Sequence, residues 1–148
     1  MREGFGGVFM MGLMMVFIVV FVSFLAIALN YAKTFRVKNG IINIIEQYQG
    51  FNEDTRGKLE DEGYLLKMNY RLGELPRGKS ASSTVSLKSV GDQYCSQDYG
   101  YCVTLRGKEG NRSYYLVETY FLFELPNFIG VKDMMFAIRG ETTSIVTS

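Results

Sequence analysis

The chain has no histidine and no tryptophan, and only two prolines and two cysteines occur among its 148 residues. Histidine is the side chain most often used as a general base near neutral pH and as a metal ligand, so its absence removes the usual parts of hydrolytic and metal-dependent sites. The net charge is +1, from 16 basic and 15 acidic residues, which argues against a surface that follows nucleic-acid phosphates. We therefore expect no enzyme, no cofactor, no bound metal and no nucleic-acid partner.

Sequence motifs for chemistry are equally scarce. Neither GxGxxG nor GxxxxGK[ST], the patterns of phosphate-binding glycine loops, occurs in the chain. Two carboxylate pairs, Asp92 with Asp98 and Glu118 with Glu124, are the nominal candidates for acid–base chemistry. Glu118 and Glu124 are predicted to lie on one face of the same strand with Tyr120 and Leu122, in positions more typical of a partly exposed sheet surface than of an active site.

One long apolar run contrasts with these absences. Residues 8–29 contain no charged side chain, and as a helix they would be about 33 Å long, enough for a hydrocarbon core of about 30 Å. A core helix of this size normally carries a polar face, which this run lacks. The pattern predicts a short tail over residues 1–7 and a transmembrane helix over residues 8–30.

A cleaved secretory signal is the alternative for this run. Residues 26–28, Ala-Ile-Ala, have the small-x-small form of a cleavage site. The run is longer than the usual apolar core of a signal peptide, about 7–15 residues, and Arg2 before it is offset by Glu3. An uncut anchor is favoured.

Small residues interrupt the run at Gly12, Ser23, Ala26 and Ala28. Small side chains let membrane helices approach closely, so these four positions are predicted to pack against a neighbouring helix.

Two signals disagree about orientation. Lys33, Arg36 and Lys38 follow the run whereas a single arginine precedes it, and the positive-inside rule would then place the C-terminal part in the cytoplasm. Cys95 and Cys102 lie too far apart for a CxxC redox pair and are predicted to form a disulfide, which would contribute roughly 2–2.5 kcal/mol and persist only in an oxidising compartment. Two unpaired thiols are the alternative. We expect an extracytoplasmic domain on a single-pass cell-membrane anchor.

After the run, residues 31–50 predict an amphipathic stem that continues the same helix, locally weakened at Asn39-Gly40. The apolar residues predicted to form its buried face are Tyr31, Phe35, Ile41, Ile42, Ile45 and Tyr48.

A second, short helix is predicted to begin at Asn52 as N-cap, with Glu53 and Asp54 in its first turn and Gly63 at its end. The acidic residues 60–62 are most simply a solvated face of this helix, and a cation site there is the weaker alternative.

The remaining chain, within a domain over residues 51–148, is predicted to be mostly strands. The predicted strands are residues 64–72, 84–90, 101–106, 112–125, 134–139 and 142–146, with a mobile loop over residues 73–83, a turn at 107–111, a stop at Pro126 and a link through Gly140. A run of strands without intervening helices favours an antiparallel sheet packed on the stem helix. The expected fold class is α+β.

Six tyrosines gather around the cysteines and the predicted hairpin. They either pack the sheet or form an exposed contact patch. They are Tyr94, Tyr99, Tyr101, Tyr114, Tyr115 and Tyr120.

This layout resembles the pilins, in particular the TadE-like minor pilins or pseudopilins of tight-adherence systems. The resemblance rests on the apolar run, the stem YAKTFRVKNGIINIIEQYQG and the C-terminal FELPNFIGVKDMMFAIRGET. Pilins carry a glutamate five residues into the processed chain, and a junction at Gly4-Phe5 would put Phe9 at that position. The resemblance implies a structural subunit, or a tip or initiation component, of a cell-surface filament or secretion apparatus. It also implies that its partners are membrane lipid, assembly-platform proteins and pilin-like subunits in a homo- or hetero-oligomer.

Two other functions remain open. A membrane-anchored binding module would use the sheet and its tyrosines to recognise a protein or an envelope polymer. An anchored enzyme would need convergent polar groups that the sequence does not display.

Overall fold

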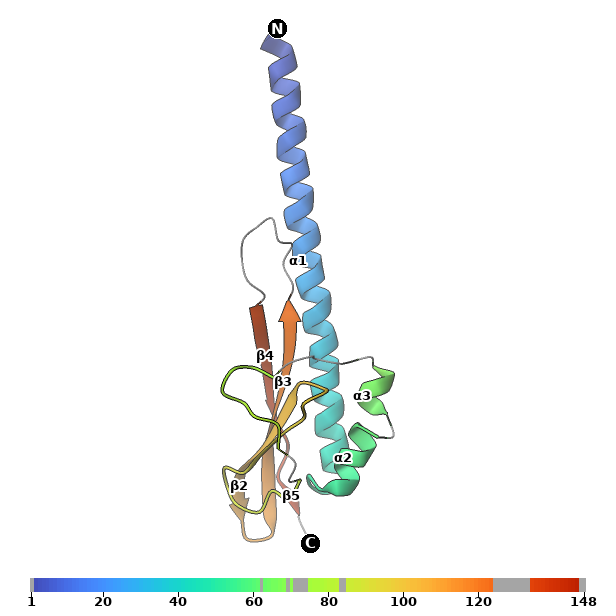
Figure 1. The fold of residues 1–148 in the computed structure, drawn as a ribbon, viewed down its shortest axis with the longest axis vertical. Coiled ribbons are helices and arrows are strands. Elements are labelled where there is room, and N and C mark those ends of the chain that lie inside the picture. The colour runs from blue at the N-terminus through green and yellow to red at the C-terminus, as the bar shows by residue number, and fades with distance from the viewer. Residues whose placement is uncertain are drawn as a thin grey trace. The chain divides into compact units, whose positions relative to one another are not determined.

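The computed structural model describes residues 2–148 except 62, 69, 71–74, 83–84, 124–133 and 147–148. The chain divides into two compact units, Met1–Ala32 and Lys33–Ser148. Helix α1 (Arg2–Gln47) runs through both of them without interruption, as predicted for the apolar run and the stem (Figure 1).

The second part of α1 buries one face in the larger unit. Val37, Ile41 and Ile45 follow one another at four-residue spacing and are fully buried. The predicted face is therefore correct at Ile41 and Ile45, but it is wrong at Tyr31 and Phe35, which are 52% and 42% exposed. Phe35 lies two residues before Val37, about 200° away around the helix, so both cannot point at the same core.

The helix continues through Gly40, where the missing side chain leaves room for a side chain from another element. A Cβ at this position would overlap the phenol of Tyr64, which packs directly on the helix backbone. The tyrosine hydroxyl donates to the carbonyl of Arg36 at 3.4 Å. Gly40 thus allows a close side-chain approach to α1.

Helix α2 (Glu53–Leu59) starts as predicted, with Asn52 accepting from the backbone N–H of Thr55 at 2.9 Å. It ends at Leu59 and not at Gly63. Gly63 has φ = 92° and instead precedes helix α3 (Tyr64–Lys67).

The predicted strand over residues 64–72 is wrong where the structure describes it, because residues 64–67 form α3 and 68 and 70 belong to no strand. Short alternating apolar runs do not separate strand from helix. Here one turn of helix buries Leu65 and leaves Leu66 53% exposed. Residues 69, 71 and 72 lie outside the described part.

The sheet is antiparallel, with strand order β1-β2-β3-β4 and with β5 also paired to β3. Its strands are β1 (Gln93–Cys95), β2 (Tyr101–Glu109), β3 (Arg112–Phe123), β4 (Met134–Glu141) and β5 (Ile145–Val146). The predicted hairpin is confirmed, but its turn is shorter than predicted. Residues 107–109 belong to β2, and β2 and β3 pair up to a two-residue turn at Gly110-Asn111, with an irregular register between Leu105 and Gly107.

Two strand predictions need correction. Residues 85–90 form no strand. The predicted pairing of residues 134–139 with 142–146 is also wrong, because β4 and β5 both pair with β3 and follow one another along it. Between them, the N–H of Thr142 donates to the carbonyl of Tyr115, and the N–H of Tyr115 donates to the Thr142 hydroxyl. These bonds keep the chain beside β3, so Gly140 lies inside β4 and not in a turn. Pro126 and Glu124 lie outside the described residues.

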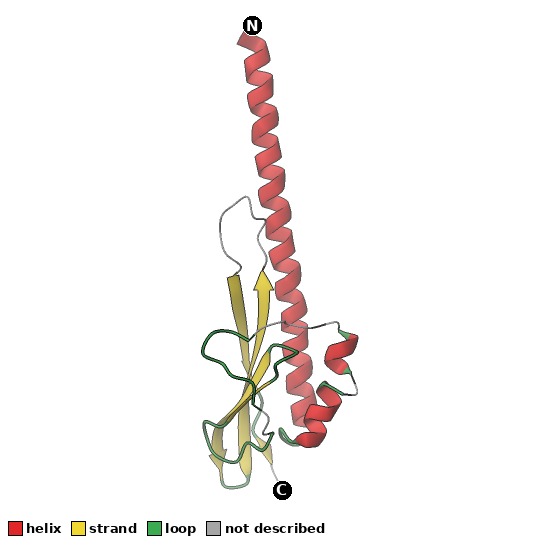
Figure 2. Ribbon diagram, viewed as in Figure 1, coloured by secondary structure: helices red, strands yellow, loops and turns green. Residues whose placement is uncertain are grey.

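The two faces of the sheet are covered differently. The helical part of the larger unit covers one face, where Tyr101, Val103 and Val117 join the buried face of α1 in the main core (Figure 2). On the opposite face, Leu75 and Met135 pack on a small cluster around the two cysteines. The predicted α+β fold, with an antiparallel sheet packed on the stem helix, is confirmed.

Candidate functional site: an exposed apolar helix surface and two polar clusters

The apolar part of α1 is long enough and apolar enough to cross a membrane, and it is the only such helix among the described residues. None of its membrane-length segment is buried inside the protein. Phe17, for example, is 72% exposed, and the better covered Ile27 is still 37% exposed. Nothing in the smaller unit therefore shields this surface from its surroundings.

The four small residues predicted to pack against another helix do not all share one face. At 100° per residue, Gly12, Ser23 and Ala26 fall within a sector of about 60°, whereas Ala28 lies on the opposite side. We call the first three the small-residue stripe. Beside Gly12 the helix carries a shallow apolar groove formed with Val8 and Val16. Ser23 satisfies its own hydroxyl by donating to the Val19 carbonyl at 2.8 Å, so no polar group obstructs this face.

The predicted disulfide is present between Cys95 and Cys102. The two residues lie directly opposite each other on β1 and β2, with Cα atoms 4.1 Å apart. The bridge closes the turn that joins these strands and is buried. It is a structural element and has no thiol available for chemistry.

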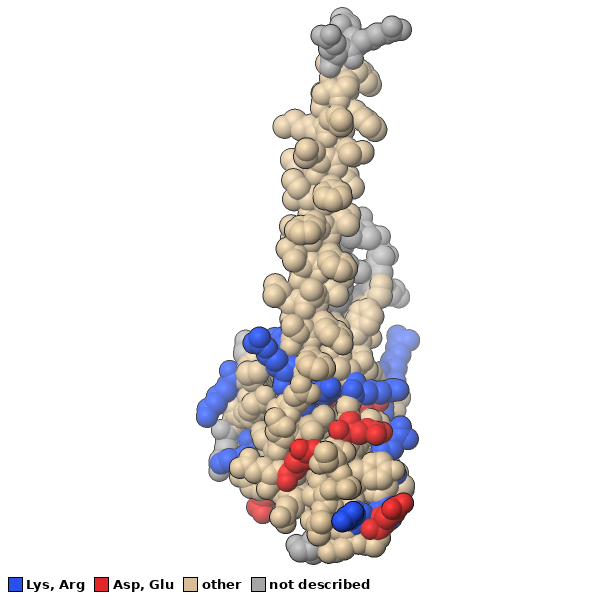
Figure 3. All heavy atoms as spheres, turned by 180° about the vertical axis from the view of Figure 1, so that it is seen from behind, with Lys and Arg blue, Asp and Glu red and all other residues tan. Residues whose placement is uncertain are grey.

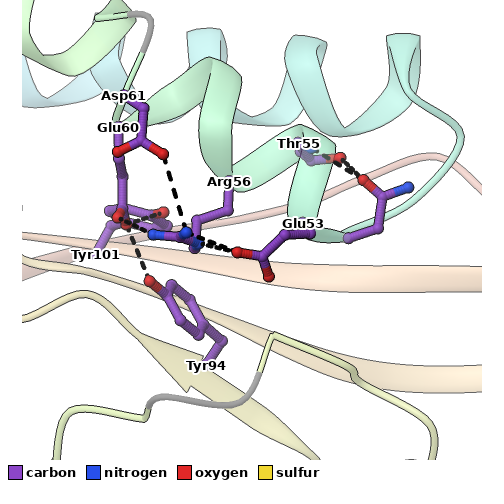
Figure 4. A network of polar contacts seen from close by, with 8 residues as sticks. Glu53, Thr55, Arg56, Glu60, Asp61, Tyr94 and Tyr101 are labelled. Carbon is purple, nitrogen blue, oxygen red and sulfur yellow. Dashed lines mark hydrogen bonds and ion pairs between the residues drawn. The ribbon is translucent and has the colours of Figure 1, made fainter.

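A first polar cluster joins α2 to the sheet (Figure 4). The carboxylate of Glu60 accepts from the hydroxyls of Tyr101 at 2.7 Å and Tyr94 at 3.1 Å. Arg56 reaches the other oxygen of Glu60 at 3.3 Å and pairs with Glu53 at 2.6 Å. Burial, reinforced by the nearby carboxylate, raises the pKa of both tyrosines above the ordinary value. Both tyrosines therefore keep their hydroxyl protons through neutral pH.

The prediction of a solvated acidic face is thus wrong for Glu60, whose side chain is only 11% exposed. The two tyrosine hydroxyls and Arg56 satisfy its carboxylate away from water, which makes that burial tolerable. The prediction holds for Asp61, which is 69% exposed, and Glu62 lies outside the described residues.

A second polar cluster lies on the opposite face of the sheet around Glu118, whose side chain is 4% exposed. It accepts from Arg139 on β4 at 2.6 Å and from Lys79 at 3.1 Å. Tyr120 donates to the same carboxylate at 3.2 Å. Burial alone would raise the pKa of Glu118, but Lys79 and Arg139 outweigh it and hold that pKa below its usual value. The pKa of Tyr120 rises to about 12, first through burial and then through Glu118.

Glu118 therefore links β3 to β4 and to the segment around Lys79 through ion pairs. Lys79 also donates to Gln93 at 3.2 Å, and the N–H of Ser82 donates to the carbonyl of Cys95 at 3.3 Å. Together these bonds fasten the segment 75–82 to the outer face of the sheet. Glu124, its predicted companion, lies outside the described residues.

The two members of the other predicted carboxylate pair lie on either side of β1 along the chain. One oxygen of Asp92 accepts the backbone N–H groups of Lys88 and Ser89 at 2.9 and 2.8 Å, which shapes a turn. Asp98 is exposed in the turn after β1. Within the described residues, no three acidic or cysteine side chains come together as metal ligands would, and every buried polar side-chain atom has a partner.

Five of the six tyrosines pack the sheet: Tyr94, Tyr99, Tyr101, Tyr115 and Tyr120 are buried. Tyr114 is 39% exposed and lies across Gly107 on the neighbouring strand. The packing interpretation is thus confirmed for the buried five, and a single half-exposed ring is too little for a contact patch.

Sequence reasoning missed both polar clusters. In a strand, every second residue lies on the same face, so Leu116, Glu118 and Tyr120 share the face opposite Val117. This placement of Glu118 could have been predicted from the sequence. Lys79 has no such signal, because it comes from an irregular segment whose path only the folded chain reveals.

Comparison with protein-family models, with curated proteins and with solved structures finds no match to this chain. Its architecture does resemble the type IV pilin fold, through the long N-terminal apolar helix, the antiparallel sheet and the disulfide.

Proposed function

We propose that the chain is a pilin-like structural subunit, of the kind of TadE-like minor pilins and pseudopilins, that serves a bacterial cell-surface filament or a secretion or adherence apparatus. The observation that carries the proposal is the apolar part of α1, which is exposed on every side in a chain whose larger unit is folded and disulfide-bonded. Such a surface needs a second environment that the chain itself does not supply.

Lipid and a bundle of like helices are the two environments that suit this surface. An apolar helix sits in the hydrocarbon core before assembly, and in a helical bundle afterwards, with van der Waals packing as the main attraction between helices. The polar clusters of the larger unit support the same role, since they hold its elements together.

The small-residue stripe is the proposed contact surface between helices. Gly12, Ser23 and Ala26 let a neighbouring backbone approach closely, and the groove beside Gly12 can accept a protruding side chain of that neighbour. Ala28, on the other side, provides a matched position for comparison.

Replacing Ala26 tests the proposal. In A26F the ring is tolerated by fluid lipid but clashes in a packed bundle, so crosslinked oligomers or purified filaments should be lost while membrane insertion and the disulfide remain. The control A28F adds the same volume on the opposite side and should reduce assembly less. Assembly that persists when Gly12, Ser23 and Ala26 are all enlarged would rule out polymerisation through this stripe, and the anchored binding module would become the better function.

The proposed function also requires the larger unit to lie outside the cytoplasm. The disulfide supports this placement, because such bridges persist in oxidising compartments. A cysteine at the exposed Ala81, in a chain whose two native cysteines are replaced, should react with a membrane-impermeant reagent on cells without an outer barrier. Labelling only after lysis would mean that Lys33, Arg36 and Lys38 set the orientation.

A signal sequence cut near residues 26–28 would also fit the apolar helix. Intact-mass analysis of the protein from native membranes distinguishes the two cases, because cleavage there removes most of the apolar helix. The proposal expects residues 8–29 to be retained.

A further inference from the structure

Basic side chains gather at one end of the larger unit, the end at which the chain enters it from the apolar helix. Figure 3 shows Lys and Arg concentrated there, with Asp and Glu mostly farther along the unit. Lys33 and Arg36 lie at the start of the part of α1 that belongs to the larger unit, and both are exposed. They stand three residues apart, so their side chains leave neighbouring positions on the helix surface.

Contacts around α1 bring two further basic residues to the same level. The hydroxyl of Tyr64 donates to the carbonyl of Arg36, which places α3 beside this turn of α1, and Lys67 at the end of α3 is exposed. On the sheet side, Gly140 of β4 lies against the aliphatic stem of Lys38, and the adjacent Arg139 is 68% exposed. We call Lys33, Arg36, Lys38, Lys67 and Arg139 the basic collar.

Arg139, one of the collar residues, pairs with a carboxylate that also has a second basic partner. Arg139 pairs with Glu118, but Glu118 also pairs with Lys79, so this cluster of three retains one positive charge. Lys38 is largely buried, with its ammonium 4.3 Å from the centre of the Phe35 ring. Lys33, Arg36 and Lys67 are the collar residues best exposed to a ligand on α1 and α3.

Helix geometry sets the depth of the first two residues. Lys33 comes four residues after Leu29, the last residue of the apolar run, and Arg36 comes seven after it, which amounts to about 6 and 10 Å along α1. The headgroup layer on each side of a bilayer is about 5–8 Å thick, and long basic side chains extend toward it. Both side chains therefore reach the level of lipid phosphates when the run spans the hydrocarbon core.

We propose that the basic collar binds the headgroups of anionic phospholipids in the leaflet that borders the larger unit. The collar would recruit anionic lipid around the helix and hold the unit against the membrane surface before assembly. This inference rests on the membrane span alone and goes beyond the proposed function, because it does not require the chain to form filaments.

Lipid selectivity of the full chain tests the proposal. The disulfide-bonded protein is reconstituted at low density in phosphatidylcholine vesicles with a trace of spin-labelled phosphatidylglycerol or spin-labelled phosphatidylcholine. The ratio of the two motionally restricted fractions gives the preference for the anionic lipid. The wild type should prefer phosphatidylglycerol severalfold at low salt, since a basic residue at an anionic surface changes binding by up to about fivefold. The preference should weaken in 0.5 M salt, a condition in which the Debye length is only about 4 Å.

The decisive variant is K33Q/R36Q/K67Q, which should lower the ratio to near one. It spares Arg139, whose loss would alter the Glu118 cluster, and Lys38, whose stem packs on Gly140. The matched control R106Q/K108Q/R112Q removes the same charge from exposed positions around the β2–β3 turn and should keep the wild-type ratio. Circular dichroism and the intact disulfide verify that both variants fold.

Any of four results would overturn the proposal. A wild-type ratio near one would show no anionic preference, and an unchanged ratio in K33Q/R36Q/K67Q would show that the collar does not cause it. An equal drop in both triple variants would assign the preference to net charge. Loss of crosslinked oligomers in the collar variant at an unchanged lipid ratio would assign the collar to a neighbouring subunit, and this readout is separate from the A26F test of assembly.

Discussion

Helix α1 contains two stretches that are both rich in large apolar residues but that meet different surroundings. In the stretch up to Ala32, a large residue such as Ile18 is 56% exposed, whereas Ile41 in the stretch after Lys33 is fully buried. The later stretch has charged and polar residues on its other sides, and the earlier one is apolar all round. A one-sided apolar helix finds its partner within the chain, here the sheet, while an all-round apolar helix needs partners outside it.

Substituting the same residue type in both stretches should give the largest difference. I41A removes three carbons from a fully buried site and should lower the free energy of unfolding of the larger unit by about 2–5 kcal/mol. I18A should change it by less than about 0.5 kcal/mol, because the residue contributes nothing to that core. Denaturant unfolding of the full chain in detergent, followed by tyrosine fluorescence, measures both. Equal effects of the two substitutions would mean that the apolar stretch is part of the folded unit.

The two stretches also differ in how well they could be predicted. The apolar run needs no partner to be recognised, since length and lack of charge are enough, and its helix was correctly predicted. The stem packs against the sheet, so its buried face depends on how the sheet is placed. Val37 is buried there, and the predicted Phe35 is not, although both residues are apolar. Periodicity reports that a face exists, and the sheet decides which of two competing apolar stripes is buried.

The sheet shows the same limit. The β2–β3 hairpin is a local structure with turn residues between its strands, and both strands were predicted, although β2 extends three residues beyond its predicted end. The course of the chain after β4 was not, because it depends on the bonds between Thr142 and Tyr115, which are distant in sequence. The ion pair between Lys79 and Glu118 could not be predicted for the same reason, since the two residues are also distant in sequence. Local signals predicted the elements, and long-range polar contacts determined their connections.

Removing the disulfide should have the next largest effect, and only in the larger unit. The bridge closes a loop of about eight residues, so C95A/C102A should lower the free energy of unfolding by about 2.5 kcal/mol. Membrane insertion of the apolar stretch should be unchanged, which alkaline extraction of membranes would verify. If C95A/C102A were extracted from the membrane, the disulfide would affect the insertion of the apolar stretch, contrary to this prediction.

Acid should weaken the larger unit through Glu118. Its pKa is lower in the folded protein than the ordinary value of 4.5, because Lys79 and Arg139 favour the carboxylate. The unfolded chain then binds the proton more readily, so this stabilisation is present above pH 4.5 and is lost as the pH falls through the folded pKa. E118Q should lower the free energy of unfolding at pH 7 by about 2 kcal/mol and flatten its decline below pH 4.5. The exposed Glu109 is the control, and E109Q should keep the wild-type pH dependence.

The smallest effect is expected at the start of α2, where Asn52 accepts the N–H of Thr55 at 2.9 Å. N52A leaves that N–H without its cap and should cost about 1 kcal/mol, whereas N52D keeps an acceptor in the same place and should be nearly neutral. Because α2 carries Arg56 and Glu60, fraying of its first turn should also loosen the cluster that holds Tyr94 and Tyr101. Burial, the main cause of their raised pKa, would then weaken. The absorbance of ionised tyrosine at alkaline pH should therefore rise at lower pH in N52A than in the wild type, while N52D follows the wild type. An unchanged titration in N52A would mean that the sheet alone keeps the two tyrosines buried. The larger unit could then lose the start of α2 without exposing its core.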